Sequence, residues 1–66
     1  MNLQSYCGMH VMIISVDGEI FFGRVDDYFF PEDNENGAES IILKTYNEDL
    51  IEFTEKDIKK IILANQ

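Results

Sequence analysis

The chain has 66 residues, with 13 acidic and five basic side chains and a formal net charge of −8. A chain of this length has room for one hydrophobic core and no second domain. The single cysteine, Cys7, excludes a disulfide framework, and Cys7 with His10 supplies too few ligands for a structural zinc site. The shortage of basic residues argues against a surface for duplex DNA, because each phosphate contact requires a lysine or an arginine.

The first half of the chain predicts a β-hairpin. Val11–Val16 is an apolar run with several β-branched residues, and Asp17-Gly18, a typical hairpin turn, follows it directly. The second strand is expected over residues 19–28, and we assign to the interior the alternating face formed by Phe21, Gly23 and Val25. A glycine in mid-strand indicates a sharp bend or a close backbone approach, which a small barrel requires.

The second half predicts three more strands. A polar loop, a third strand, a turn and a short fourth strand are expected at residues 31–38, 40–46, 47–49 and 50–53. Thr54 begins a stretch that suits one 3₁₀ turn, and Ile58 to Leu63 follows as a fifth strand. The alternative is a C-terminal helix over residues 54–64, and the three isoleucines favour the strand. Residues 1–7 are consistent with a helical turn that places Leu3 and Tyr6 over one end of the barrel.

This order of elements resembles the five-stranded, strongly bent SH3-like barrel of the Sm and Sm-like (Lsm) family. The residues that carry the resemblance are Gly8, Val11, Ile13, Asp17-Gly18, Phe21, Gly23 and Val25, together with the stretch from Ile51 to Ile58. The acidic loop ending in Glu39-Ser40 is similar to that of uncharacterised bacterial and phage-type Sm-like proteins. The resemblance implies a single all-β domain over residues 1–66, with an N-terminal extension at 1–7, the barrel at 8–63 and a tail at 64–66.

The RNA-binding positions of the family differ in this chain. Sm proteins that bind RNA hold a base with an Asp and an Asn after the second strand and with an Arg-Gly pair in the second motif. Here the first loop, residues 31–38, is longer and acidic, and Thr54-Glu55-Lys56 stands where Arg-Gly is expected. The family's RNA-binding residues are therefore not transferred to this sequence.

Three other patterns are best explained without a catalytic or metal-binding role. The loop from Glu32 to Gly37 resembles the start of a calcium loop, but its twelfth position is Leu43 instead of glutamate. Cys7 and His10 lack an oriented base and an oxyanion site, and Cys7 is expected to be half-buried. Asp26 and Asp27 are adjacent in a strand, so their carboxylates should diverge. We expect no catalytic residue, no metal and no cofactor, and no enzyme activity.

Surplus apolar residues predict an interface. Side chains that should point away from the core or lie beside the acidic loop are Ile20, Phe22, Phe29, Phe30, Ile42 and Leu50. The fourth and fifth strands are open edges, and the resemblance implies that the fourth strand of one subunit pairs with the fifth strand of the next. The competing explanation is that the N-terminal segment covers this face within one chain.

The sequence thus favours a non-catalytic interaction or assembly module that forms homo-oligomers. The first alternative is an RNA-binding Sm-like protein that uses Arg24, Lys44, Lys56, Lys59 and Lys60. The second is a monomeric adaptor that takes a peptide strand from a protein partner on an open edge. The absence of a signal-peptide pattern or of an apolar run long enough to span a membrane predicts a cytoplasmic protein with no membrane partner.

Overall fold

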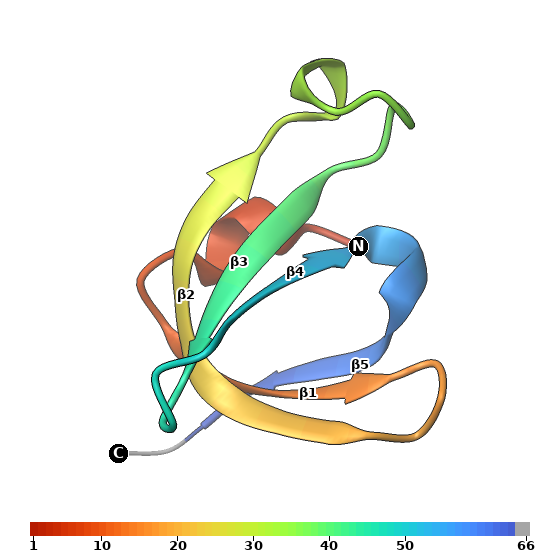
Figure 1. The fold of residues 1–66 in the computed structure, drawn as a ribbon. Helices are drawn as coiled ribbons and strands as arrows, with labels where there is room; N and C mark the ends of the chain where they lie inside the picture. The colour runs from red at the N-terminus through yellow and green to blue at the C-terminus, as the bar shows by residue number, and fades with distance from the viewer. Residues whose placement is uncertain (65–66) are drawn as a thin grey trace.

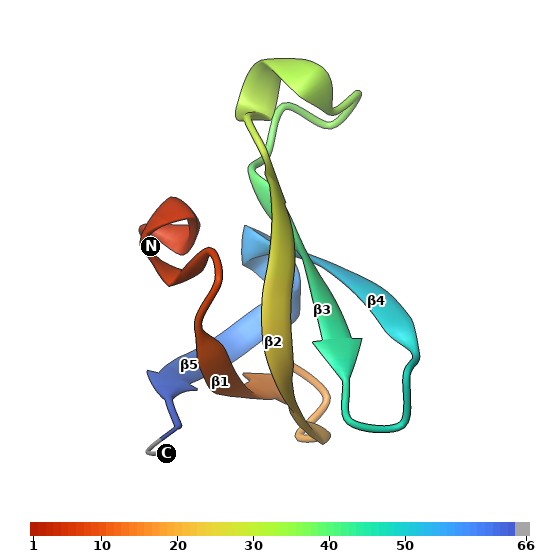
Figure 2. The ribbon, with the colours of Figure 1, turned by 90° about the vertical axis from the view of Figure 1, so that its left-hand side faces the viewer.

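Five antiparallel strands form one bent sheet in the order β4-β3-β2-β1-β5 in the computed structural model, which describes residues 1–64 (Figure 1). The strands are β1 (His10–Ser15), β2 (Ile20–Phe29), β3 (Ser40–Thr45), β4 (Leu50–Thr54) and β5 (Ile58–Leu63). Three 3₁₀ turns accompany them, η1 (Leu3–Tyr6), η2 (Pro31–Asp33) and η3 (Glu55–Asp57). Figure 2 shows β2 along the length of the molecule, with β3 and β4 to one side and β1 and β5 to the other.

The expected barrel is correct in its five antiparallel strands, but the sheet does not close. β4 and β5 are its two edges and do not pair with each other. Four antiparallel pairings separate them across the sheet, so β4 and β5 could pair with each other only as parallel strands. Parallel neighbours need a crossover of about a dozen residues or more. The three residues of η3 cannot provide one, and both edges stay open.

The concave face of the sheet holds the core. Its buried residues come from all five strands and from η1: Leu3, Val11, Ile13, Val25, Ile41, Leu43, Phe53 and Ile58. The prediction that Phe21, Gly23 and Val25 face inward is confirmed, with Phe21 only partly buried against the core. η1 carries fully buried Leu3 into this cluster, as expected for a helical turn over the end of the sheet.

The β1–β2 hairpin differs in detail from the expected two-residue turn. The N–H of Ser15 donates to the Glu19 carbonyl at 2.8 Å, so three residues, Val16 to Gly18, form the loop. Gly18 has φ +85°, the left-handed conformation that three-residue hairpin loops place at their last position. The Asp-Gly signal therefore located the hairpin correctly but gave the wrong loop length.

The β2–β3 loop projects beyond the sheet, as Figures 1 and 2 show, and is held at its base by Asn34. The Nδ2 of Asn34 donates to the Ala38 carbonyl at 2.6 Å and to the Ser40 Oγ at 3.1 Å. Buried Ser40 in turn donates to Glu52 Oε2 on β4 at 2.8 Å. The polar loop thus extends into solvent while its base is tied to the sheet.

The C-terminal segment forms the predicted strand and not the alternative helix. Thr54 and Asp57 bracket η3 as a capping box, in which Asp57 Oδ2 accepts from the Thr54 N–H at 2.9 Å. The chain then enters β5 at Ile58, which pairs with β1. Of the predicted tail at 64–66, residues 65 and 66 lie outside the described part of the chain.

The Tyr28 hydroxyl on β2 makes the stability of the fold depend on pH in the alkaline range. Its hydroxyl donates to Glu39 Oε1 at 2.8 Å, and this hydrogen bond, with smaller contributions from desolvation and nearby carboxylates, raises the pKa of Tyr28 to about 12. The unfolded chain loses the same proton near pH 10. Stability from this group is therefore complete below about pH 10 and is lost as the pH rises to about 12. Urea unfolding across this range should show a steeper loss for the native chain than for Tyr28→Phe; equal slopes would contradict the assignment.

Candidate interaction surface

The two open edges of the sheet carry opposite charge. On β4 and at its ends lie Asp49, Glu52 and Glu55, whereas β5 carries Lys59 and Lys60. Within residues 1–64, neither of these two lysines pairs with a carboxylate. The edges are therefore complementary to each other in charge.

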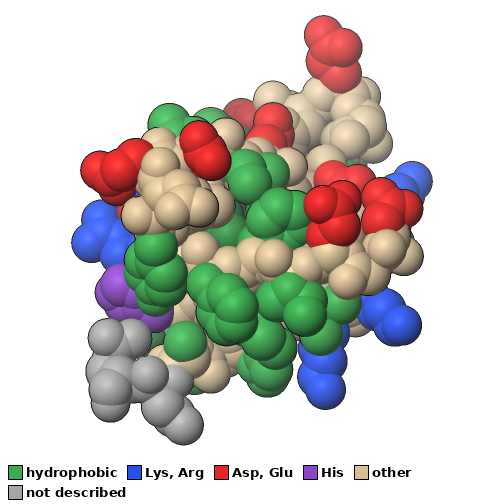
Figure 3. Space-filling view, turned by 60° about the horizontal axis from the view of Figure 1, so that its bottom comes forward, with side chains coloured by type: hydrophobic (Ala, Val, Ile, Leu, Met, Phe, Trp, Pro, Cys, Tyr) green, Lys and Arg blue, Asp and Glu red, His purple; other side chains and the backbone are tan. Residues whose placement is uncertain are grey.

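An apolar patch covers the convex face of β1, β5 and the first half of β2. Cross-strand register places Phe22 beside Met12 and Met12 beside Ile62, while Ile20 lies beside Ile14 in the next row. None of these outward positions is a carboxylate. Figure 3 shows hydrophobic side chains gathered over this end of the molecule, with lysine or arginine side chains at the borders. On a chain of net charge −8, this face is unusually free of negative charge.

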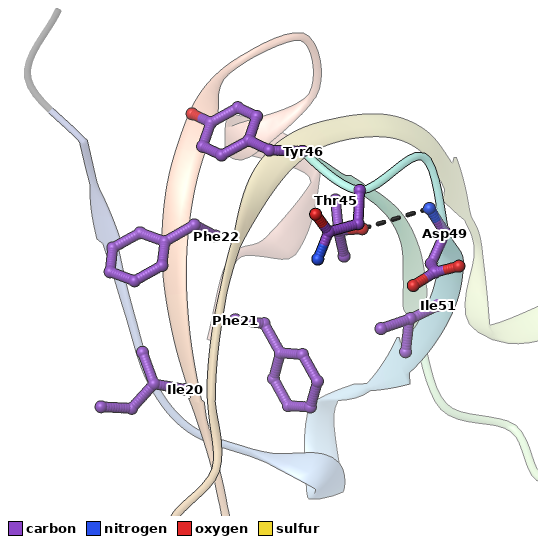
Figure 4. Close-up of a pocket in the computed structure, with 8 residues that line it drawn as sticks. Ile20, Phe21, Phe22, Thr45, Tyr46, Asp49 and Ile51 are labelled. Carbon is purple, nitrogen blue, oxygen red and sulfur yellow. Dashed lines mark hydrogen bonds between the residues drawn. The ribbon is translucent and has the colours of Figure 1, made fainter.

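A hollow of about 350 Å³ lies between the start of β2 and the β3–β4 turn. Figure 4 shows Phe21 and Ile51 pointing toward each other from β2 and β4, while Ile20 and Phe22 point to the other side of β2. Phe21 is held by an edge-to-face contact with Phe53, with ring centroids 5.2 Å apart. The hollow therefore offers an apolar floor next to the β4 edge, which suits one apolar side chain of a partner.

The turn beside this hollow has a defined conformation. The N–H of Asp49 donates to the Thr45 Oγ1 at 3.1 Å, and Glu48 adopts φ +70°. The Tyr46 side chain extends from this turn, and its hydroxyl lies 3.2 Å from His10 Nδ1 on β1. The turn thus fixes one wall of the hollow.

The structure separates the six predicted interface residues into two groups. Ile20, Phe22 and Leu50 are exposed and lie around the hollow or at the β4 edge. Phe29, Phe30 and Ile42 lie elsewhere, at the loop end of β2 and on β3. Phe30 packs edge-to-face on Tyr28 with ring centroids 5.1 Å apart, so part of its surface is covered within the chain.

The five predicted nucleic-acid contacts also fall into two groups. Arg24 and Lys44 are direct cross-strand partners on β2 and β3. Both are engaged with carboxylates, Arg24 Nε with Asp26 at 2.8 Å and Lys44 Nζ with Glu48 at 3.6 Å. The others, Lys56, Lys59 and Lys60, belong to η3 and β5.

The residues considered for metal binding or acid–base chemistry remain apart. Cys7 is exposed and not half-buried, because it follows η1 in a connecting turn outside the core. Asp26 accepts from Arg24, whereas Asp27 Oδ1 accepts from the Tyr28 N–H at 3.0 Å, so the two carboxylates have different partners. A β-bulge between Val25 and Asp27 interrupts the alternation from which we expected them to diverge. Among residues 1–64, no three His, Cys, Asp or Glu side chains gather where they could hold a metal ion.

Among the exposed apolar residues that the sequence did not indicate as part of an interface are Tyr46, Ile62 and Leu63. Ile62 and Leu63 end an unbroken run of isoleucine and leucine, in which no polar residue marks the face that meets solvent. Their place at an edge strand is visible only from the strand order.

Comparison of the chain with protein-family models, with curated proteins and with solved structures finds no match. In the described part of the chain, no helix has the length and hydrophobicity to cross a bilayer.

Proposed function

We propose that the protein is a non-catalytic assembly module with an Sm-like arrangement of its strands, and that copies associate through β4 of one and β5 of the next. The observation that carries this proposal is the pair of unpaired sheet edges at the two ends of one five-stranded sheet. Exposed strand edges are templates for pairing with another chain unless they are short, charged throughout or covered. Here both edges also carry exposed apolar side chains, Leu50 on β4 and Ile62 and Leu63 on β5.

The charges of the two edges favour this pairing over others. Joining two β4 edges would bring acidic residues together, and joining two β5 edges would oppose lysines. A β4–β5 contact instead matches opposite charges, which offsets part of the repulsion between copies of net charge −8. Because the two surfaces differ, each copy still has one free edge after one contact, so the assembly grows into a closed ring or a filament.

Absolute mass in solution tests the proposal. Light scattering after size exclusion, at tens of micromolar protein, should give a mass several times the 7.7 kDa of one chain. Ile62→Lys should return the mass to that of the monomer, because it buries an unpaired charge in the joint. Val16→Lys adds the same charge at an exposed position of the β1–β2 turn and should leave the assembly intact. A native chain that stays monomeric throughout would overturn self-association.

The hollow beside β4 favours a second candidate, an adaptor for a peptide strand of another protein. Its apolar floor of Phe21 and Ile51 lies next to the open edge, so a strand added to β4 could place one side chain there. A monomeric native chain that retains one defined partner in a pull-down, and loses it on Phe21→Ala, would support this candidate in place of self-association.

A further inference from the structure

The free edge of β4 presents the backbone groups of alternate residues. The N–H of Thr45 donates to the Asp49 carbonyl at 2.9 Å, so these two residues form a hydrogen-bonded pair of the β3–β4 ladder. In an antiparallel ladder such pairs recur at every second residue. Ile51 and Phe53 therefore turn their N–H and C=O groups toward β3. Leu50 and Glu52 turn theirs toward the open edge.

The free edge of β5 follows from the same alternation. The N–H of Ala64 donates to the His10 carbonyl at 2.9 Å, which makes the next hydrogen-bonded pair Met12 with Ile62. The N–H and C=O groups of Ile61 and Leu63 consequently point away from β1, toward solvent. Each edge thus offers a fixed set of donors and acceptors to a partner strand.

We infer that β4 of one copy and β5 of the next form an antiparallel joint in one register, with Leu50 opposite Leu63 and Ile51 opposite Ile62. This inference rests on the self-association proposed above. The register pairs the outward-directed backbone groups of Leu50 with those of Leu63 and those of Glu52 with those of Ile61. Continued by one residue along both strands, it also sets Phe53 opposite Lys60, and the β5 bulge beyond Lys60 ends the regular alternation.

The side chains favour this register over its neighbours. Only shifts of two residues preserve the hydrogen bonding, because a shift of one turns the backbone groups of one strand away from the other. One such shift sets Ile51 against Lys60, and the opposite shift moves Leu50 past the end of β5. The inferred register instead covers three apolar side chains that a single chain leaves 67%, 57% and 40% exposed, those of Leu50, Leu63 and Ile62.

The order of the β4 edge supports the same placement. The Ser40 hydroxyl already holds Glu52 Oε2 at 2.8 Å, so part of the ordering cost is met before the copies meet.

Mixed cysteine variants test the register directly. In a Cys7→Ser background, Ile51→Cys and Ile62→Cys are prepared separately, mixed in equal amounts and oxidised. Opposed residues of this non-hydrogen-bonded pair should have Cα atoms about 4.5 Å apart, within the range that a disulfide spans. A covalent dimer should form in the mixture and not in either variant alone. A mixture of Ile51→Cys with Lys60→Cys reports the register shifted by two residues. This mixture should give much less covalent dimer.

The outcomes separate this inference from the proposed function. If light scattering shows an assembly but the disulfide forms only with Lys60→Cys, or with neither variant, the register is wrong and self-association stands. If the Cys7→Ser protein is monomeric, both the inferred register and the proposed self-association are wrong. Because Ile51 is partly buried, circular dichroism of each variant is the control for folding. Should Ile51→Cys not fold, the exposed pair Leu50→Cys and Leu63→Cys gives the same test, with an expected Cα separation of about 5.5 Å.

Discussion

Replacing Gly23 with alanine should destabilise the protein by about 3 kcal/mol, at the upper end of the usual cost of overpacking. A Cβ at this position would collide with the carbonyl oxygen of Lys44 and would lie 2.8 Å from its carbonyl carbon and 2.9 Å from the Thr45 Cα. These neighbours are backbone atoms of β3, so they can move only if the β2–β3 ladder opens. At about 0.1 kcal/mol per residue, a chain of this length has only several kcal/mol in total. Urea unfolding of the variant should therefore show a greatly lowered midpoint.

The matched control is Gly37→Ala in the β2–β3 loop. Gly37 has φ +70°, so alanine there is strained, but no neighbouring atom lies within 4 Å of the added Cβ. Its expected cost is about 1 kcal/mol, from the left-handed backbone alone. Equal costs for the two variants would contradict the view that Gly23 is required by the close approach of two strands.

The strands could be predicted because their signals are local. Alternation along β2, the Asp-Gly turn and the capping residues around η3 each depend on a few neighbouring residues, and all three led to the observed elements. The inward position of Gly23 followed from that alternation, and the cost of glycine in mid-strand predicted the close approach of a neighbouring backbone. The short N-terminal turn was one conformation consistent with residues 1–7, and the sequence alone did not decide it.

What the sequence did not reveal depends on the arrangement of whole strands. That β4 and β5 are the two edges of the sheet, and do not pair with each other, emerges only when all four pairings are known. The same holds for the candidate site. Phe29 and Phe30 looked equivalent to Ile20 and Phe22 as apolar residues of one segment, yet β2 carries them to the opposite end of the molecule. Ile62 and Leu63 were overlooked because an edge strand cannot be recognised from its own sequence.

Replacing Leu3 with alanine should lower the free energy of unfolding by about 2–4 kcal/mol, a typical cost for a fully buried leucine. Leu3 reaches the core from η1, outside the sheet, and the substitution leaves a cavity between η1 and the strands beneath it. Urea unfolding measures this cost. A loss below about 1 kcal/mol would mean that residues 1–7 add little to the fold.

The same substitution at Leu50 distinguishes the core from the proposed joint. Both are Leu→Ala changes, but Leu50 is exposed on the β4 edge and touches little in a single chain. The cost of Leu3→Ala should therefore be the same at every protein concentration, since it arises within one chain. The cost of Leu50→Ala should be near zero in dilute protein and should grow as the concentration rises, because assembly stabilises the folded state by mass action. If the cost of Leu50→Ala did not change with concentration, the open β4 edge would have no role in self-association.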